Sequence, residues 1–83
     1  MPYIDPVDRP PMDSVVNAMK SAGVEPDGKL NYVLFKFCKD TVKPSYSNYK
    51  NFIGELNECV AEIRRRLLAP YENKKIQING DVE

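Results

Sequence analysis

The stretch from residue 45 to 69 carries the pattern that most constrains the fold of this chain. Apolar side chains recur there at alternating spacings of three and four residues, at Tyr46, Tyr49, Ile53, Leu56, Val60, Ile63 and Leu67. This spacing predicts a helix that packs along one face against another helix. Ser45 is a favourable N-cap. With a rise of ~1.5 Å per residue the helix would be about 36 Å long, which is long for a chain of 83 residues.

Prolines mark both ends of this long helix. Pro44 ends a preceding helix, which we expect over residues 27–42, and Pro70 follows the long helix of residues 45–69. Because proline lacks an amide N–H and its ring clashes with the preceding turn, we expect a kink at Pro70 and a helical continuation over residues 70–79. Residues 80–83 are predicted to be a loose tail.

The N-terminal part is predicted to hold an arm and a short helix. Four prolines fall within the first eleven residues, which predicts an extended Pro-rich arm over residues 1–11. A helix over residues 13–23 follows, with Asp13 or Ser14 as N-cap and Gly23 at its C-terminal end. The helix over 27–42 is apolar around most of its circumference, which indicates either a central helix or a subunit interface.

These elements predict an all-α protein, a small helical bundle or hairpin of three helices in one domain spanning residues 1–83. The long helix has more apolar length than two short helices can cover. We therefore expect a homo-oligomer that associates through the second and third helices, with a compact three-helix monomer as the alternative. The predicted interface residues are Tyr49, Ile53, Leu56, Val60, Ile63, Leu67 and Phe35.

The composition contains little catalytic chemistry. The chain has no His and no Trp, and its four glycines are isolated from one another. The commonest general base and metal ligand is therefore missing, as is a glycine-rich phosphate loop. We expect no catalytic residue, no metal and no cofactor, and we interpret the chain as a non-enzyme. Cys38 and Cys59 lie in apolar helical segments, where reduced core thiols are expected, with a disulfide between them as the alternative.

The charges balance, with 12 Lys and Arg against 12 Asp and Glu. A net charge of zero argues against nucleic acid and against an anionic membrane surface as partners. No apolar run approaches the ~20 residues that a transmembrane helix needs. We therefore expect a cytoplasmic protein.

A basic and aromatic group of residues forms the candidate ligand site. Guanidinium and ammonium groups bind phosphate, and tyrosine rings stack on planar bases. If two long helices pair antiparallel, Tyr46 of one chain approaches the arginine run of the other. The alternative is a solvated face, because three adjacent arginines point roughly 100° apart around a helix. The candidate ligand-binding residues are Arg64, Arg65, Arg66, Tyr71, Lys74, Lys75, Tyr46 and Lys43.

Several stretches of the sequence carry a family resemblance. They are Met1-Pro2-Tyr3-Ile4, Asp27-Gly28 with Leu30-Asn31-Tyr32, Lys43-Pro44-Ser45-Tyr46, Ala69-Pro70-Tyr71-Glu72 and Asn79-Gly80-Asp81-Val82. Together they resemble a family of short uncharacterised proteins found in phages and bacteria, with no established activity. The resemblance implies a phage-type accessory protein. Small phage accessory proteins without catalytic residues commonly act on host defence, so the resemblance implies such a role.

Two binding functions follow as hypotheses. The first is a non-enzymatic oligomer that sequesters a small phosphorylated, nucleotide-derived ligand at its interfaces, as an anti-defence sponge. The second is a protein–protein inhibitor or adaptor that acts on a host protein through an apolar helical face. A nucleic-acid-binding role is a weaker third hypothesis, because the second helix is too apolar to lie in a DNA groove.

Overall fold

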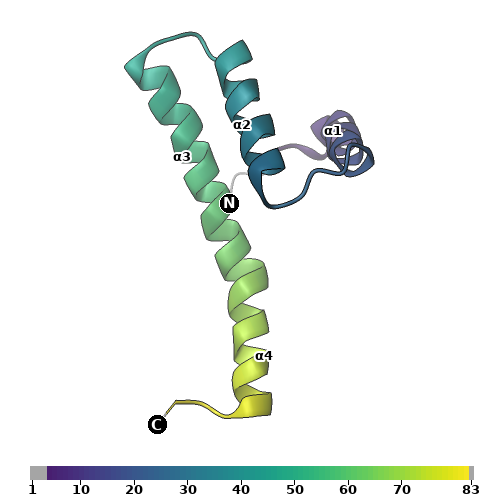
Figure 1. The fold of residues 1–83 in the computed structure, drawn as a ribbon, viewed down its shortest axis with the longest axis vertical. Helices are drawn as coiled ribbons and strands as arrows, with labels where there is room; N and C mark the ends of the chain where they lie inside the picture. The colour runs from purple at the N-terminus through teal and green to yellow at the C-terminus, as the bar shows by residue number, and fades with distance from the viewer. Residues whose placement is uncertain (1–3, 83) are drawn as a thin grey trace. The chain divides into compact units, whose positions relative to one another are not determined.

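The fold is all-helical in a computed structural model that describes residues 4–82 (Figure 1). No strand occurs among those residues. The predicted fold class is confirmed at this level, with three helical segments of which the last is long. In chain order the elements are η1 (Pro6–Asp8), α1 (Arg9–Ser21), α2 (Gly28–Thr41), α3 (Tyr46–Ile63), η2 (Arg64–Leu68) and α4 (Ala69–Asn79).

The chain divides into two compact units, residues 1–39 and residues 40–83. The first unit contains η1, α1 and most of α2. The extended arm predicted over residues 1–11 is wrong for residues 6–11, where a 3-10 turn leads directly into α1 at Arg9. Pro10 and Pro11 lie in the first turn of α1. Proline costs little there, because the first amide groups of a helix have no acceptor within the helix. Residues 1–3 of the predicted arm lie outside the described residues.

The early start of α1 also changes the role of its predicted N-caps. Asp13 and Ser14 lie inside the helix, and the Ser14 hydroxyl donates to the Pro10 carbonyl oxygen, 3.3 Å away. At the other end, Gly23 adopts a φ of +74°, the left-handed conformation that favours glycine after a helix. The Asp27 carboxylate then accepts the amide N–H of Lys29 at 2.8 Å. Asp27 therefore caps the start of α2.

The second unit is dominated by a continuous helical rod from Tyr46 to Asn79, 34 residues long (Figure 1). Ser45 has extended backbone angles, and its hydroxyl oxygen accepts the amide N–H of Asn48 at 3.0 Å. This bond satisfies one of the amide groups that the first turn leaves without an acceptor, so the rod begins where the sequence predicts.

A π-helical turn, η2, separates α3 from α4. The amide N–H of Ala69 donates to the carbonyl oxygen of Arg64, five residues earlier, where an α-helix would use the residue four earlier. Pro70 follows at once. Its ring would clash with the carbonyl of Arg66 in a regular α-helix, and a wider turn relieves such a clash. The predicted boundary at Pro70 is therefore a change of helix type over residues 64–68, and a kink there stays a prediction.

Neither unit encloses a buried side chain among the described residues. The most covered apolar side chains are half-buried, among them Met19, Leu30 and Val33 in the first unit and Phe52 and Leu56 in the second. Large apolar side chains remain exposed along both. A chain of this mass that folds as a compact monomer buries well over half of its unfolded surface. These helices therefore present apolar faces that the units themselves do not cover.

Candidate functional site

The most extensive candidate site is the apolar face of the rod in the second unit. Its α3 part consists of Tyr46, Tyr49, Ile53, Leu56, Val60 and Ile63, all of which are exposed except the half-buried Leu56. Ile53 is 55% exposed and Val60 is 50% exposed. Side chains of this size are normally covered in a stable protein. The face is therefore a candidate surface for another protein chain.

The π-turn decides which residues continue this face into α4. In an uninterrupted α-helix the seven-residue repeat would continue from Ile63 through Leu67 to Pro70, Lys74 and Gln77. The turn inserts one additional residue. Each residue after the turn therefore lies on the side of the helix where the residue before it would lie in a regular α-helix. The residues of α4 that share the face of Ile63 are then Tyr71, Lys75 and Ile78. Leu67 and Leu68 lie on either side of the middle of this face. We call Tyr46, Tyr49, Ile53, Leu56, Val60, Ile63, Leu68, Tyr71, Lys75 and Ile78 the seam.

Two of the three predicted phosphate-binding arginines are paired with a carboxylate of their own helix. The Arg65 guanidinium lies 2.7 Å from one carboxylate oxygen of Glu62, and the Arg66 guanidinium lies 3.7 Å from the other. The Glu62 side chain is 18% exposed, whereas both arginine side chains are largely exposed. Glu62 thus occupies the position between two guanidinium groups that an external anion would take. Arg64 is exposed beside them.

Two tyrosines of the rod each lie beneath a lysine. The Lys50 ammonium lies 5.8 Å from the centre of the Tyr46 ring, and the Lys75 ammonium lies 5.7 Å from that of Tyr71. Both are cation–π contacts, and in each pair the lysine lies one helical turn after the tyrosine. At each place an aromatic face and a positive charge are side by side. This combination can hold a planar group that carries an anion.

A shallow hollow of about 410 Å³ lies beside the second of these tyrosines. It is lined by Pro70, Tyr71, Asn73, Lys74 and Gln77. The hollow joins one ring, one ammonium and two amide side chains, all from α4. It therefore brings together Tyr71 and Lys74 from the predicted ligand site and adds Asn73 and Gln77, which the sequence analysis did not select.

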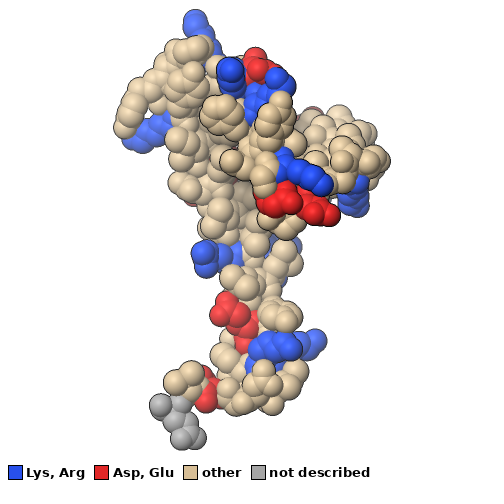
Figure 2. Space-filling model, in the orientation of Figure 1, with Lys and Arg blue, Asp and Glu red and all other residues tan. Residues whose placement is uncertain are grey.

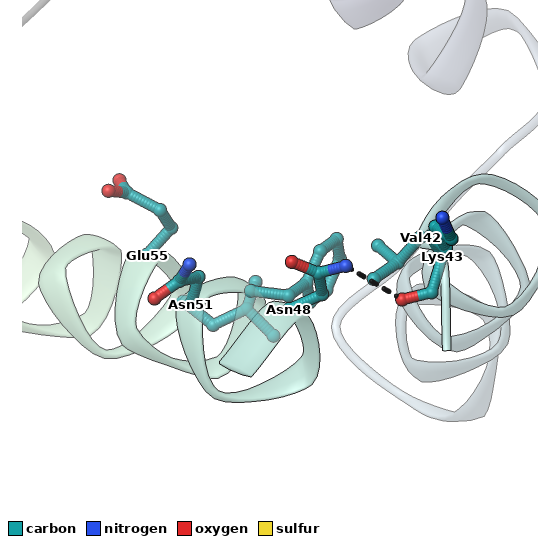
Figure 3. A pocket seen from close by; sticks show the side chains of 7 residues that line it. Val42, Lys43, Asn48, Asn51 and Glu55 are labelled. Carbon is teal, nitrogen blue, oxygen red and sulfur yellow. Dashed lines mark hydrogen bonds between the residues drawn. The ribbon is translucent and has the colours of Figure 1, made fainter. Parts of the chain in front are cut away.

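A second hollow, of about 510 Å³, lies at the start of α3 (Figure 3). The Asn48 side-chain amide donates to the Lys43 carbonyl oxygen at 3.0 Å and ties the preceding loop to the helix. Apolar groups from Val42, Phe52 and Leu56 line this hollow together with Asn51 and Glu55. Lys43 contributes here, but Tyr46 does not line it. The structure therefore separates two residues that were predicted to share one site.

The charges of η2 and α4 are mixed. Figure 2 shows basic, acidic and uncharged areas alternating along this stretch. Such a surface attracts a specific ligand at short range and exerts little long-range attraction on polyanions. The eight predicted ligand residues are thus spread over separate places: Lys43, the pair of Tyr46 with Lys50, the Glu62–arginine cluster, and the Tyr71 region.

The sequence analysis did not identify the two tyrosine–lysine pairs, although each pair has a readable signal. Lys50 follows Tyr46 by four residues, and Lys75 follows Tyr71 by four, the spacing at which side chains meet on a helix. Glu62 precedes Arg66 by the same interval. The predicted interface residues Val60, Ile63, Leu67 and Phe35 are exposed, Phe35 on α2 of the first unit at 68%. Whether a partner covers them stays a prediction.

Other kinds of site can be described briefly. Both cysteines are free thiols, and Cys59 is exposed rather than part of a core. Within residues 4–82 no three His, Cys, Asp or Glu side chains gather closely enough to hold a metal ion. No helix in the described part of the chain has the length and apolar character needed to cross a bilayer.

Fold and site define an all-helical protein with uncovered apolar faces and two tyrosine–lysine pairs. The chain belongs to the family named domain of unknown function DUF6899, whose family model matches residues 1–82. No curated protein and no solved structure matches the chain.

Proposed function

We propose that this protein is a non-enzymatic binding protein that works by covering the apolar faces of its helices with another protein chain. The observation that supports this proposal is the absence of any buried side chain in either unit, among the described residues, while Ile53, Val60 and Ile63 stay about half exposed. Apolar area removed from water contributes roughly 25 cal/mol per Å². Covering a face of this length is therefore a strong driving force for association.

The second observation in favour of this function is the distribution of charge. The charged side chains of the rod other than Lys75 lie outside the seam, and Figure 2 shows basic and acidic areas that alternate rather than form one basic surface. Stable protein interfaces have an apolar centre and a polar rim, so the arrangement fits a protein partner. The partner is a second copy of this chain, a host protein, or both.

A pair of variants tests the proposal. Val60→Asp places a carboxylate in the middle of the apolar face, and Ala61→Asp places the same group on the neighbouring position away from it. The wild type and Ala61→Asp should form a complex with a protein chain, either in sedimentation or by capture and identification of a stoichiometric partner. Val60→Asp should lose that complex. A monomer that captures no partner, or a complex that both variants retain, would contradict the proposal.

A small phosphorylated ligand is a second candidate, favoured by the Tyr71 region. The Tyr71 ring borders a hollow with Lys74, and the Lys75 ammonium lies over the same ring. A planar base can use the uncovered ring face while the two ammonium groups bind phosphate. Such a ligand would make the protein a sequestering sponge, of the anti-defence type. Native mass spectrometry tests this directly: a retained mass of a few hundred daltons in wild type that is absent in Lys74→Ala supports it.

A further inference from the structure

We infer that the chain which covers the seam is a second copy in antiparallel orientation, in a register that the π-turn sets. This inference rests on the proposed function, because it names the occupant of the apolar face. It concerns only the rod of the second unit, Tyr46–Asn79, in which α3, η2 and α4 follow one another without a break.

The seam is complementary to its own reverse. The seam alternates between the first (a) and the fourth (d) positions of a seven-residue repeat. In two antiparallel helices each a position of one helix faces a d position of the partner. When the first seam position of one copy faces the last of the other, the second faces the second-last, and so on. The ten positions then form five different layers, each a pair of facing side chains. These are Tyr46 with Ile78, Tyr49 with Lys75, Ile53 with Tyr71, Leu56 with Leu68, and Val60 with Ile63. Each layer occurs twice, once on either side of a two-fold axis that passes between Val60 and Ile63.

The π-turn is what makes the two halves match. With α-helical spacing throughout, the positions that follow Ile63 would be Leu67, Pro70, Lys74 and Gln77, and only Leu67 would place a large apolar side chain in a layer. With one inserted residue, Leu68, Tyr71 and Ile78 enter the layers. The insertion thus places the aromatic and aliphatic side chains of α4 opposite those of α3.

Charge selects the antiparallel orientation. Side-by-side parallel helices would bring the Lys75 ammonium groups of both copies into one layer, which is unfavourable. In the antiparallel register Lys75 lies opposite the Tyr49 ring, a favourable cation–aromatic neighbour. The flanking positions also place Lys50 of one copy next to Glu72 of the other, twice per dimer. Opposite charges at flanking positions are a common determinant of orientation in paired helices.

The two ends of such a dimer are composite. The tyrosine–lysine pair at the start of α3 in one copy, Tyr46 with Lys50, comes close to the pair in α4 of the other, Tyr71 with Lys75. Each pair is a short cation–π contact within its own chain. A dimer therefore carries two equivalent places where rings and ammonium groups from both chains meet, and neither place is complete in one chain.

Disulfide trapping between two differently tagged chains tests the register. In a background with Cys38→Ala and Cys59→Ala, one chain carries Ile53→Cys and the other carries Tyr71→Cys. Under mild oxidation we expect a covalent dimer in the mixture and little in either chain alone. The pair Leu56→Cys and Leu68→Cys should behave in the same way. Circular dichroism of each variant confirms that its helices are retained.

The alternative outcomes separate this inference from the proposed function. Parallel pairing would give covalent dimers in each single variant alone and would overturn the register. No crosslink in any mixture would overturn it as well. In that case a wild-type oligomer, or a captured host protein that Val60→Asp releases, would leave the proposed function standing. A wild-type monomer that captures no protein partner would contradict both the antiparallel dimer and the proposed function.

Discussion

The amide N–H of Ala69 donates its hydrogen bond to the carbonyl oxygen of Arg64, five residues earlier. This one bond determines which side of α4 continues the apolar face of α3. It brings Tyr71 and Ile78 into line with Ile63, and it lies directly before the proline that makes a regular turn unfavourable. The π-turn therefore links a local constraint, Pro70, to the surface that the molecule presents.

Replacement of Pro70 by alanine tests this link. The substitution restores an amide N–H and removes the ring, so the turn can return to α-helical spacing. Tyr71, Lys75 and Ile78 would then rotate out of line with Ile63, and self-association should weaken by about tenfold, which corresponds to about 1.4 kcal/mol. Sedimentation equilibrium measures the change. The matched control is Pro70→Ala combined with deletion of Arg64, because the deletion removes the inserted residue from a helix without the proline and returns the two halves to line; equal weakening in both variants would contradict the role of the turn.

A charge in the middle of the seam should dissociate the complex. Val60→Asp places a carboxylate where another chain is expected to cover it, and burying a polar or charged group without a partner costs at least ~2 kcal/mol. We expect the molecular mass in solution to fall while helix content measured at high concentration stays similar. Ala61→Asp, one residue further on, should leave the mass unchanged.

The N-cap of α3 should contribute measurably to stability. The Ser45 hydroxyl accepts the amide N–H of Asn48 at 3.0 Å. Removal of such a cap by Ser45→Ala is expected to lower the free energy of unfolding by about 1 kcal/mol. Urea unfolding at a fixed protein concentration measures this loss. Ser45→Asp should restore most of it, and Ser47→Ala should have no comparable effect; an unchanged midpoint in Ser45→Ala would exclude a stabilising cap.

The Glu62 carboxylate should compete with anions for the arginines. It lies 2.7 Å from the Arg65 guanidinium and 3.7 Å from that of Arg66. Because the arginines are largely exposed, Glu62→Gln should change the free energy of unfolding by less than about 1 kcal/mol. If η2 binds phosphate, the same variant should bind it several-fold more tightly in calorimetric titration. Glu58→Gln is the control. Unchanged phosphate binding in Glu62→Gln would argue against an anion site at η2.

The Tyr71 region can be tested separately from association. Lys74→Ala removes one ammonium from the hollow that Tyr71 borders. We expect loss of a retained phosphorylated ligand in native mass spectrometry with no change in oligomer mass. Lys20→Ala, in α1, should retain the ligand. Retention by Lys74→Ala at the wild-type level would place the ligand elsewhere or exclude it.

Much of the fold could be read from local chemistry. The start of α3 follows from Ser45, the start of α2 from Asp27, and the end of α1 from the positive φ of Gly23. Each depends on interactions within a few residues, which sequence patterns capture well. The start of α1 was missed because Pro10 and Pro11 were interpreted as incompatible with a helix, although proline is tolerated in a first turn.

The candidate site was less predictable for a different reason. The seven-residue repeat was predicted to run through Leu67, but a π-turn has no strong sequence signature, so Leu68, Lys75 and Ile78 were not assigned to the apolar face. The predicted ligand residues were grouped by type and proximity in sequence. In the structure the Arg65 and Arg66 guanidinium groups lie against Glu62, and Lys43 lines a hollow that does not include Tyr46.

The most direct test is the mass of the wild-type chain in solution. Sedimentation equilibrium over a hundredfold range of concentration should give a multiple of the 9.5 kDa chain mass, and Val60→Asp should shift it toward a single chain. A wild-type protein that stays at one chain mass throughout, with an unfolding midpoint independent of concentration, would contradict self-association through the seam.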